Sequence, residues 1–295
     1  MPVIDAHVHL YPPEVNRDPA GWATAQGEPH WAVMCARSRK STGRPVQGFP
    51  SVDDLLRDMD GAGVDRAVLL GWYWEKHDTC VLQNRFYAEC VRAHPDRLSA
   101  FAAVQAGAGE AALEEVRRAH ADGLIGLGEL SPHSQGVNVN GDSWNAVLSL
   151  AAELGLPVNL HVTDPLIGNY PGRVETPLPD FLAAATAFPR LKFILAHWGG
   201  QIWRETANGA LPANVWVDTA ATPLLYGSSI WADGIAGCGT DKVLWGTDYP
   251  LELYPKEPGR GTFAGLLGEA RGRLATEADQ LAVLGGNAAQ VLAIN

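Results

Sequence analysis

The chain has 295 residues, 46% hydrophobic and 19% charged, so it can bury a large core and is too apolar for a disordered polymer. Its formal net charge of −11 disfavours a nucleic-acid binder and a protein that docks on an anionic membrane, because both need clustered basic residues. These numbers predict a compact protein that acts on a small molecule.

The amino-terminal residues show neither the basic nor the apolar region of a secretory signal. No apolar run approaches the roughly 18 residues that a membrane helix needs. The four cysteines form no C-x-x-C pair and have no zinc-finger spacing. We therefore expect a cytoplasmic protein whose cysteines are reduced and buried.

Short apolar runs alternate with amphipathic segments along the chain. The predicted strands are residues 3–5, 66–70, 98–104, 124–130, 158–162, 192–197, 215–219 and 243–247. The predicted helices are residues 52–62, 81–93, 109–119, 143–154, 178–188 and 262–270, and a weak helical pattern covers 222–239. Continuous rather than alternating hydrophobicity indicates strands that are covered on both faces, as in a parallel sheet.

Eight predicted strands in this order favour a closed (β/α)8 TIM barrel over a doubly wound open sheet. The first strand is not followed by a glycine-rich nucleotide motif, which removes support from the open sheet. Since no linker-like change in composition interrupts the chain, we expect a single α/β domain over residues 1–295.

The exception to the short loops is a segment of low periodicity at residues 11–50, inserted after the first predicted strand. Loops of this length inside compact domains are mostly functional or disordered. Because the segment contains Trp22 and Trp31 together with Tyr11 and Phe49, we expect it to be an ordered lid over the active site.

Metal-capable side chains stand at the ends of the predicted strands, where barrel enzymes carry their functional groups. His7 and His9 end the first strand, and their spacing points both imidazoles to one side, as chelation of one ion requires. The remaining four follow strands four, five, six and eight: Glu129, His161, His197 and Asp248. A single such histidine is usually a core residue, but their joint occurrence predicts a metal site.

Aromatic side chains follow several of the same strands and are candidates for substrate contacts. They are Trp72, Trp74, Trp198 and Tyr249, and His133 is a further candidate. Packing at the rim of the barrel is the alternative role for these rings. If they line the site, they suit an aromatic or planar substrate.

The strand ends resemble the amidohydrolase superfamily of metal-dependent barrel enzymes, and within it the group that includes aminocarboxymuconate semialdehyde decarboxylase. The matching segments are Ile4-Asp-Ala-His-Val-His-Leu10, Asn159-Leu-His-Val162, Leu195-Ala-His-Trp-Gly-Gly200, Leu244-Trp-Gly-Thr-Asp-Tyr-Pro250 and Gly285-Gly-Asn-Ala-Ala-Gln-Val-Leu292. The resemblance implies one divalent ion, most often zinc, held by His7, His9, His161 and Asp248. It also implies that His197 exchanges protons or bonds the metal-bound water, and that the protein forms a homodimer.

Glu129 marks a departure from part of the superfamily. Members with a carbamylated lysine carry it at the end of strand four or five, where this chain has Glu129 and His161. TatD-like deoxyribonucleases have a glutamate that bridges a second metal at the place of Glu129. Three roles stay open for Glu129: a ligand of a second ion, a hydrogen-bonding group of the catalytic pocket, or a structural residue. One ion is favoured and two are possible.

Two reactions fit these residues. In hydrolysis, water activated by the metal attacks an ester, lactone or amide carbonyl, and Asp248 and His197 move protons. In nonoxidative decarboxylation, the metal orients a vinyl or aromatic carboxylate that an arginine holds. The candidates for this arginine are Arg37, Arg39 and Arg44 in the inserted segment and Arg173 after the fifth strand. Glu129 favours the hydrolase, the decarboxylase is the alternative, and a barrel that binds metal without catalysis is the least favoured interpretation.

Overall fold

The computed structural model describes residues 1–39, 43–206, 209–252 and 262–294. Eight parallel strands follow one another in chain order around the centre of the molecule. They are β1 (Ile4–Val8), β2 (Arg66–Leu69), β3 (Leu98–Ala102), β4 (Gly126–Leu130), β5 (Val158–Leu160), β6 (Phe193–Leu195), β7 (Val215–Asp218) and β8 (Val243–Leu244). The Ala6 amide donates to the Trp245 carbonyl at 2.9 Å and links the last strand to the first. The predicted TIM barrel is confirmed.

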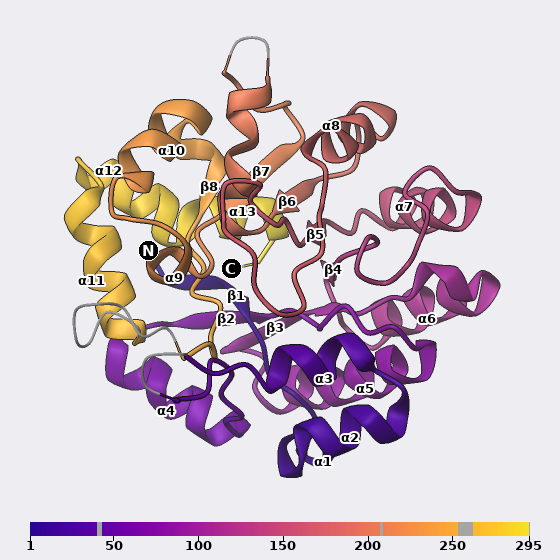
Figure 1. Ribbon diagram of the computed structural model, residues 1–295. Helices are drawn as coiled ribbons and strands as arrows, with labels where there is room; N and C mark the ends of the chain where they lie inside the picture. The colour runs from indigo at the N-terminus through magenta and orange to yellow at the C-terminus, as the bar shows by residue number, and fades with distance from the viewer. Residues whose placement is uncertain (40–42, 207–208, 253–261, 295) are drawn as a thin grey trace.

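Helices form the outer layer of the barrel (Figure 1). The longer ones are α4 (Val52–Ala62), α5 (His77–Ala93), α6 (Glu110–Ala121), α7 (Asp142–Leu154), α8 (Leu178–Ala187), α10 (Ile230–Cys238) and α11 (Phe263–Arg273). Three shorter helices are α9 (Thr222–Leu225), α12 (Glu277–Leu281) and α13 (Asn287–Leu292), and α13 packs against the strands near the middle of the barrel in this view (Figure 1). Among the described residues, no helix combines the length and the apolar character needed to cross a membrane.

Helix α5 begins four residues before the predicted helix, at His77 instead of residue 81. The cause is the buried carboxylate of Glu28, which accepts hydrogen bonds from the amides of Glu75 at 2.7 Å and Lys76 at 3.0 Å. These bonds satisfy amides next to the helix start that have no helical partner of their own. Because Glu28 lies 47 residues before Glu75 in the sequence, the residues around the start of α5 do not reveal this contact.

The inserted segment is folded over its described part into α1 (Pro13–Arg17), α2 (Pro19–Gln26) and α3 (Pro29–Cys35), which lie together in indigo (Figure 1). Each helix starts with a proline, which suits the first helical turn because the missing N–H would have no partner there. The helices are too short for a clear 3.6-residue period. Residues 40–42 lie outside the described residues, and the function of the segment as a lid stays a prediction.

Close packing between β4 and β5 fixes the strand that carries Glu129. Gly128 has a φ of +149°, and a Cβ atom there would lie 2.8 Å from the Cβ and 2.9 Å from the carbonyl oxygen of Asn159. We expect Gly128→Ala to destabilise the fold by about 2–3 kcal/mol, because backbone atoms would have to move. Thermal or urea unfolding measures this change. The control is Gly268→Ala, a position with nothing within 4 Å, and equal stability of the two variants would contradict the expectation.

Candidate metal centre

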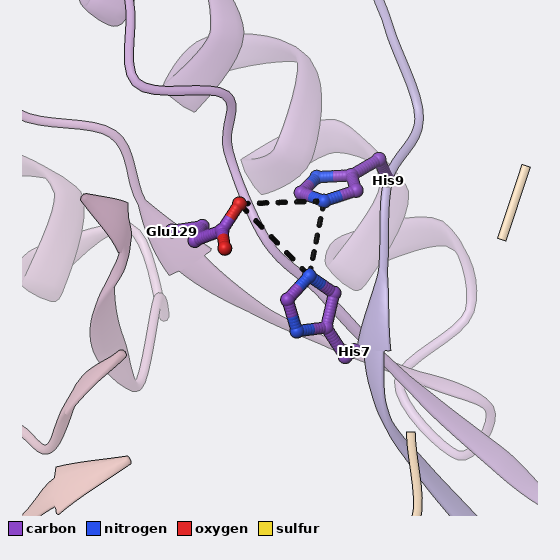
Figure 2. A group of neighbouring side chains, drawn as sticks. All are labelled: His7, His9 and Glu129. Carbon is purple, nitrogen blue, oxygen red and sulfur yellow. Dashed lines mark hydrogen bonds and ion pairs between the residues drawn. The ribbon is translucent and has the colours of Figure 1, made fainter. Parts of the chain in front are cut away.

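All six strand-end residues meet at the C-terminal end of the barrel. Among the described residues, two groups have potential ligand atoms that all lie within 4.8 Å of one another. One group is His7, His9 and Glu129 (Figure 2), and the other is Glu129, His161 and His197. Glu129 belongs to both groups, so the structure places it between two pairs of imidazoles.

The first pair is held by hydrogen bonds on the far side of each ring. His7 Nδ1–H donates to the Asp218 carboxylate at 2.9 Å, and His9 Nδ1–H donates to the Leu70 carbonyl at 2.8 Å. Because these partners accept only, Nε2 is the nitrogen of each ring that is left for a further partner, and the two Nε2 atoms lie 3.1 Å apart. Two imidazole nitrogens at this distance share either a proton or a metal ion, and rings held in this way by their other nitrogen are the usual donors of a divalent metal site.

The second pair of imidazoles, His161 and His197, is held differently. His197 Nδ1–H donates to the Ala220 carbonyl at 3.2 Å, which leaves the lone pair on Nε2. This Nε2 lies 3.3 Å from His161 Nδ1, while His161 Nε2 lies 3.3 Å from the hydroxyl of Thr163. His161 Nδ1 also lies 3.0 Å from Glu129 Oε1, so the second pair with this carboxylate offers ligand atoms for a second cation.

The carboxylate of Glu129 faces both pairs with a different oxygen. Its Oε2 lies 4.0 Å from His7 Nε2 and 3.7 Å from His9 Nε2. Its Oε1 lies 3.0 Å from His161 Nδ1 and 3.6 Å from His197 Nε2. Glu129 is 1% exposed, so its charge is shielded from water and acts on these four rings.

Asp248 completes the first group from the segment after β8. Its Oδ1 lies 3.4 Å from His9 Nε2, and its Oδ2 lies 3.8 Å from His197 Nδ1. The Asp248 amide donates to the His7 carbonyl at 2.9 Å, and its φ is +67°. One oxygen is thus directed to the first pair of imidazoles while the other stays near His197.

The charges of the site favour cations. Burial lowers the pKa of His7, but the carboxylates of Asp218, Glu129 and Asp248 outweigh it and raise this pKa to about 10. Burial raises the pKa of Glu129, yet His161, His7 and His197 hold it below its usual range. The pKa of Asp248 is likewise lowered against burial by its hydrogen bond to His9 and by nearby histidines. Both carboxylates are therefore anionic, which is what a metal ion requires.

Asp218 at the end of β7 is a site residue that the sequence interpretation missed. Its Oδ2 accepts from His7 Nδ1 and from Asn159 at 3.1 Å, and its Oδ1 accepts from the amides of His197 and Ala220 at 3.1 Å. It orients one histidine of each pair. Asp218 could have been found from the sequence by its position near the end of a predicted strand, because the other site residues also stand at strand ends.

We expect Asp218→Asn to weaken metal binding by about 10- to 100-fold, since an amide cannot accept at every position where this carboxylate does. Competition with a chromophoric chelator measures the affinity. The matched control is Asp180→Asn, because His133 Nε2 contacts Asp180 at the same 2.9 Å outside the metal centre. Equal metal affinity of both variants would contradict an orienting role for Asp218.

The predicted aromatic contacts lie at different distances from the centre. Trp72 is near it, with its ring centroid 6.1 Å from that of His9, and Trp74 packs behind it against Trp31 at 5.4 Å. Tyr73, which the sequence interpretation missed, packs against His161 at 5.0 Å.

The other three predicted contacts have partners elsewhere. The Trp198 indole donates to Thr222, Tyr249 donates to Asp58, and His133 pairs with Asp180. The role of these aromatic residues and His133 in binding substrate stays a prediction.

A comparison with family models matches residues 4–294 to the amidohydrolase family. The chain belongs to this family. It is therefore an enzyme of the amidohydrolase superfamily, in agreement with the resemblance at the strand ends. In sequence it is 25% identical over 284 residues to Decarboxylase orsB of Emericella nidulans, covering 71% of this chain and 79% of that protein.

Solved structures share the fold over the whole chain. The 5-carboxyvanillate decarboxylase LigW from Sphingomonas paucimobilis superposes with a TM-score of 0.74 at 19% identity, covering 100% of this chain and 99% of the other. A probable 2-pyrone-4,6-dicarboxylic acid hydrolase from Acinetobacter baumannii gives 0.65 at 15% identity, covering 100% of both chains. The same barrel thus serves decarboxylases and hydrolases, and at these identities it shows the fold alone.

Proposed function

We propose that the protein is a metal-dependent hydrolase of small esters, lactones or amides, with zinc as the preferred ion. The position of Glu129 between two imidazole pairs carries the proposal, because a shared carboxylate is suited to holding two cations side by side. Bound divalent ions supply Lewis acidity and acidify a coordinated water. This proposal assigns Glu129 the bridging role among the three that its sequence position leaves open.

The side chains divide the remaining tasks. His197 is occupied on Nδ1 by the Ala220 carbonyl, which suits Nε2 for metal binding more than for moving protons. Asp248 keeps Oδ2 3.8 Å from the nearest His197 nitrogen, so this oxygen is the available base at the centre. Trp72 and Tyr73 are buried beside the histidines and keep water away from this side of the site, which strengthens its electrostatics.

Metal analysis and product analysis together test the proposed hydrolase. Zinc-loaded protein is expected to contain two ions per chain and to release acid from a panel of lactones and aryl esters. Chelator-treated protein is the control and is expected to be inactive until zinc is returned. Release of carbon dioxide from aryl carboxylates without any hydrolysis product would overturn the proposal.

A second candidate function, decarboxylation of an aryl or vinyl carboxylate, is supported by two arginines at the loops that meet near Tyr73. Arg37 lies with its guanidinium 5.1 Å from the ring centre of Tyr170, and the Arg173 amide donates to the Tyr170 carbonyl at 3.1 Å. The Nε atoms of both arginines are buried and have no hydrogen-bond partner within the described part of the chain. Arg173 also bonds the Glu175 carboxylate and the Asp164 carbonyl through its terminal nitrogens, so the two Nε–H groups are the donors that suit a carboxylate. The relative Decarboxylase orsB agrees with this reading.

Arginine variants distinguish this function. Arg37→Met and Arg173→Met are expected to raise KM for an aryl carboxylate by about 10-fold or more if the acid binds there. Arg57→Met, in which an exposed arginine is replaced, is the matched control. An unchanged KM in both variants would show that neither arginine binds the carboxylate of the substrate.

A further inference from the structure

The ring of Tyr11 lies beside His9 of the metal centre, and its buried hydroxyl has no partner among the described residues. Its ring stacks on that of His9, with centroids 6.4 Å apart and an interplanar angle of 10°. The residue is 2% exposed, and no described residue makes a hydrogen bond to its hydroxyl. A buried hydroxyl without a partner is unfavourable, and such groups in folded proteins call for a functional or solvent partner.

The surroundings of Tyr11 offer donors and flat apolar surfaces. Its ring centroid lies 4.6 Å from that of Trp31, 6.3 Å from Trp74 and 6.0 Å from Phe49. The indole N–H groups of Trp31 and Trp74 are buried and also lack a partner among the residues that the structure describes. This aromatic cluster therefore has three unpaired donors, of which the Tyr11 hydroxyl belongs to the ring that contacts His9, and it is suited to a flat ligand that carries acceptors.

Tyr87 shows that the fold satisfies a tyrosine whose role is structural. It is fully buried, and its hydroxyl has the Leu70 carbonyl at 2.6 Å and the Leu10 carbonyl at 3.0 Å as acceptors for its one proton. Tyr11 lies next to Leu10 in the chain and has no such acceptor in the described residues. The contrast assigns the Tyr11 hydroxyl to a ligand rather than to the fold.

We propose that Tyr11 is a substrate-binding residue whose hydroxyl donates to a carbonyl or carboxylate oxygen of a planar, aromatic substrate. The inference rests on the proposed function and deepens it, because it names the substrate class. The proposal requires that an acyl or carboxylate group approaches the metal centre from the side of the aromatic cluster. On this side the ring centroids of Trp31 and Trp72 lie 4.7 Å apart.

Binding of benzoate to zinc-loaded protein tests the proposal without any turnover. Calorimetric titration is expected to give a Kd for benzoate about 10-fold higher in Tyr11→Phe than in the unchanged protein. Cyclohexanecarboxylate, which has the same acid on a puckered ring, is expected to bind more weakly than benzoate to the unchanged protein. No binding of benzoate, equal Kd values in the two proteins, or equal binding of the two acids would overturn the proposal.

Stability separates a binding role from a structural one. Tyr11→Phe is expected to keep its zinc content and to have an equal or higher Tm in the absence of ligand, whereas Tyr87→Phe loses bonded partners and is expected to melt lower. A drop in Tm for Tyr11→Phe like that of Tyr87→Phe would overturn the proposal. Absence of hydrolysis with an intact 10-fold effect on benzoate would overturn the proposed function alone.

Discussion

Glu129→Gln is expected to lower turnover by about 1000-fold and to reduce the zinc content from two ions per chain to one or none. The amide has one acceptor oxygen, whereas the carboxylate uses Oε2 toward His7 and His9 and Oε1 toward His161 and His197. Whichever way the amide turns, its NH2 group faces one pair of imidazoles and offers no ligand oxygen and no charge to an ion at that pair. The second group therefore loses its only carboxylate among the described ligands.

Elemental analysis after gel filtration and kcat on the best substrate of the panel measure both effects of Glu129→Gln. Glu115→Gln is the matched control, because Glu115 is also buried but bonds Asn84 and Arg118 on the outer layer. This control is expected to keep its zinc. Two zinc ions in Glu129→Gln would show that Glu129 is not a bridging ligand, and would favour the pocket or structural roles.

The barrel itself could be predicted from the sequence because its signals are local. Each strand is a short apolar run covered on both faces, and the N-caps Ser51 and Thr276 form capping boxes with the acidic residues three positions later. The predicted boundary of a helix was wrong where a long-range contact decides it, as Glu28 does at the start of α5. The three helices of the inserted segment were not predicted, because each is too short to show a helical period in its sequence.

The site could be predicted as far as strand ends define it. His7, His9, Glu129, His161, His197 and Asp248 converge because parallel strands of a barrel end on one face. The split of these residues into two groups could not be predicted, because it depends on which oxygen of Glu129 faces which ring. Asp218 was missed because its role follows from its hydrogen bond to His7. Tyr11 was missed because the proposal for it follows from a buried hydroxyl without a partner among the described residues.

The family assignment leaves the reaction open for a physical reason. Hydrolysis and decarboxylation both need a cation that polarises a carboxyl or carbonyl oxygen and a group that moves one proton. They differ in what holds the rest of the substrate, which is the task of loops such as those carrying Arg37 and Arg173 and of the cluster around Tyr11. Substrate binding at these residues, rather than the metal ligands, therefore discriminates the two reactions.

Asp248→Asn is expected to keep the fold and lose turnover by about 1000-fold. Asp248 has a φ of +67°, a left-handed conformation that asparagine and aspartate adopt more readily than other residues with a side chain. The substitution keeps the shape and the amide bond to the His7 carbonyl, and it removes the charge and the base. An equal Tm with a large loss of kcat is the expected combination, and unchanged turnover would remove Asp248 from the mechanism.

Asp248→Ala distinguishes the conformational role of this residue from the catalytic role of its carboxylate. Alanine is strained in the left-handed region, so this variant is expected to lose turnover as Asp248→Asn does and, in addition, about 1–2 kcal/mol of stability. If both variants lose turnover equally while only alanine lowers the Tm, the catalytic loss comes from the carboxylate and not from a displaced strand end. Equal destabilisation of both would instead mean that the carboxylate holds β1 and β8 together, through the oxygen 3.4 Å from His9.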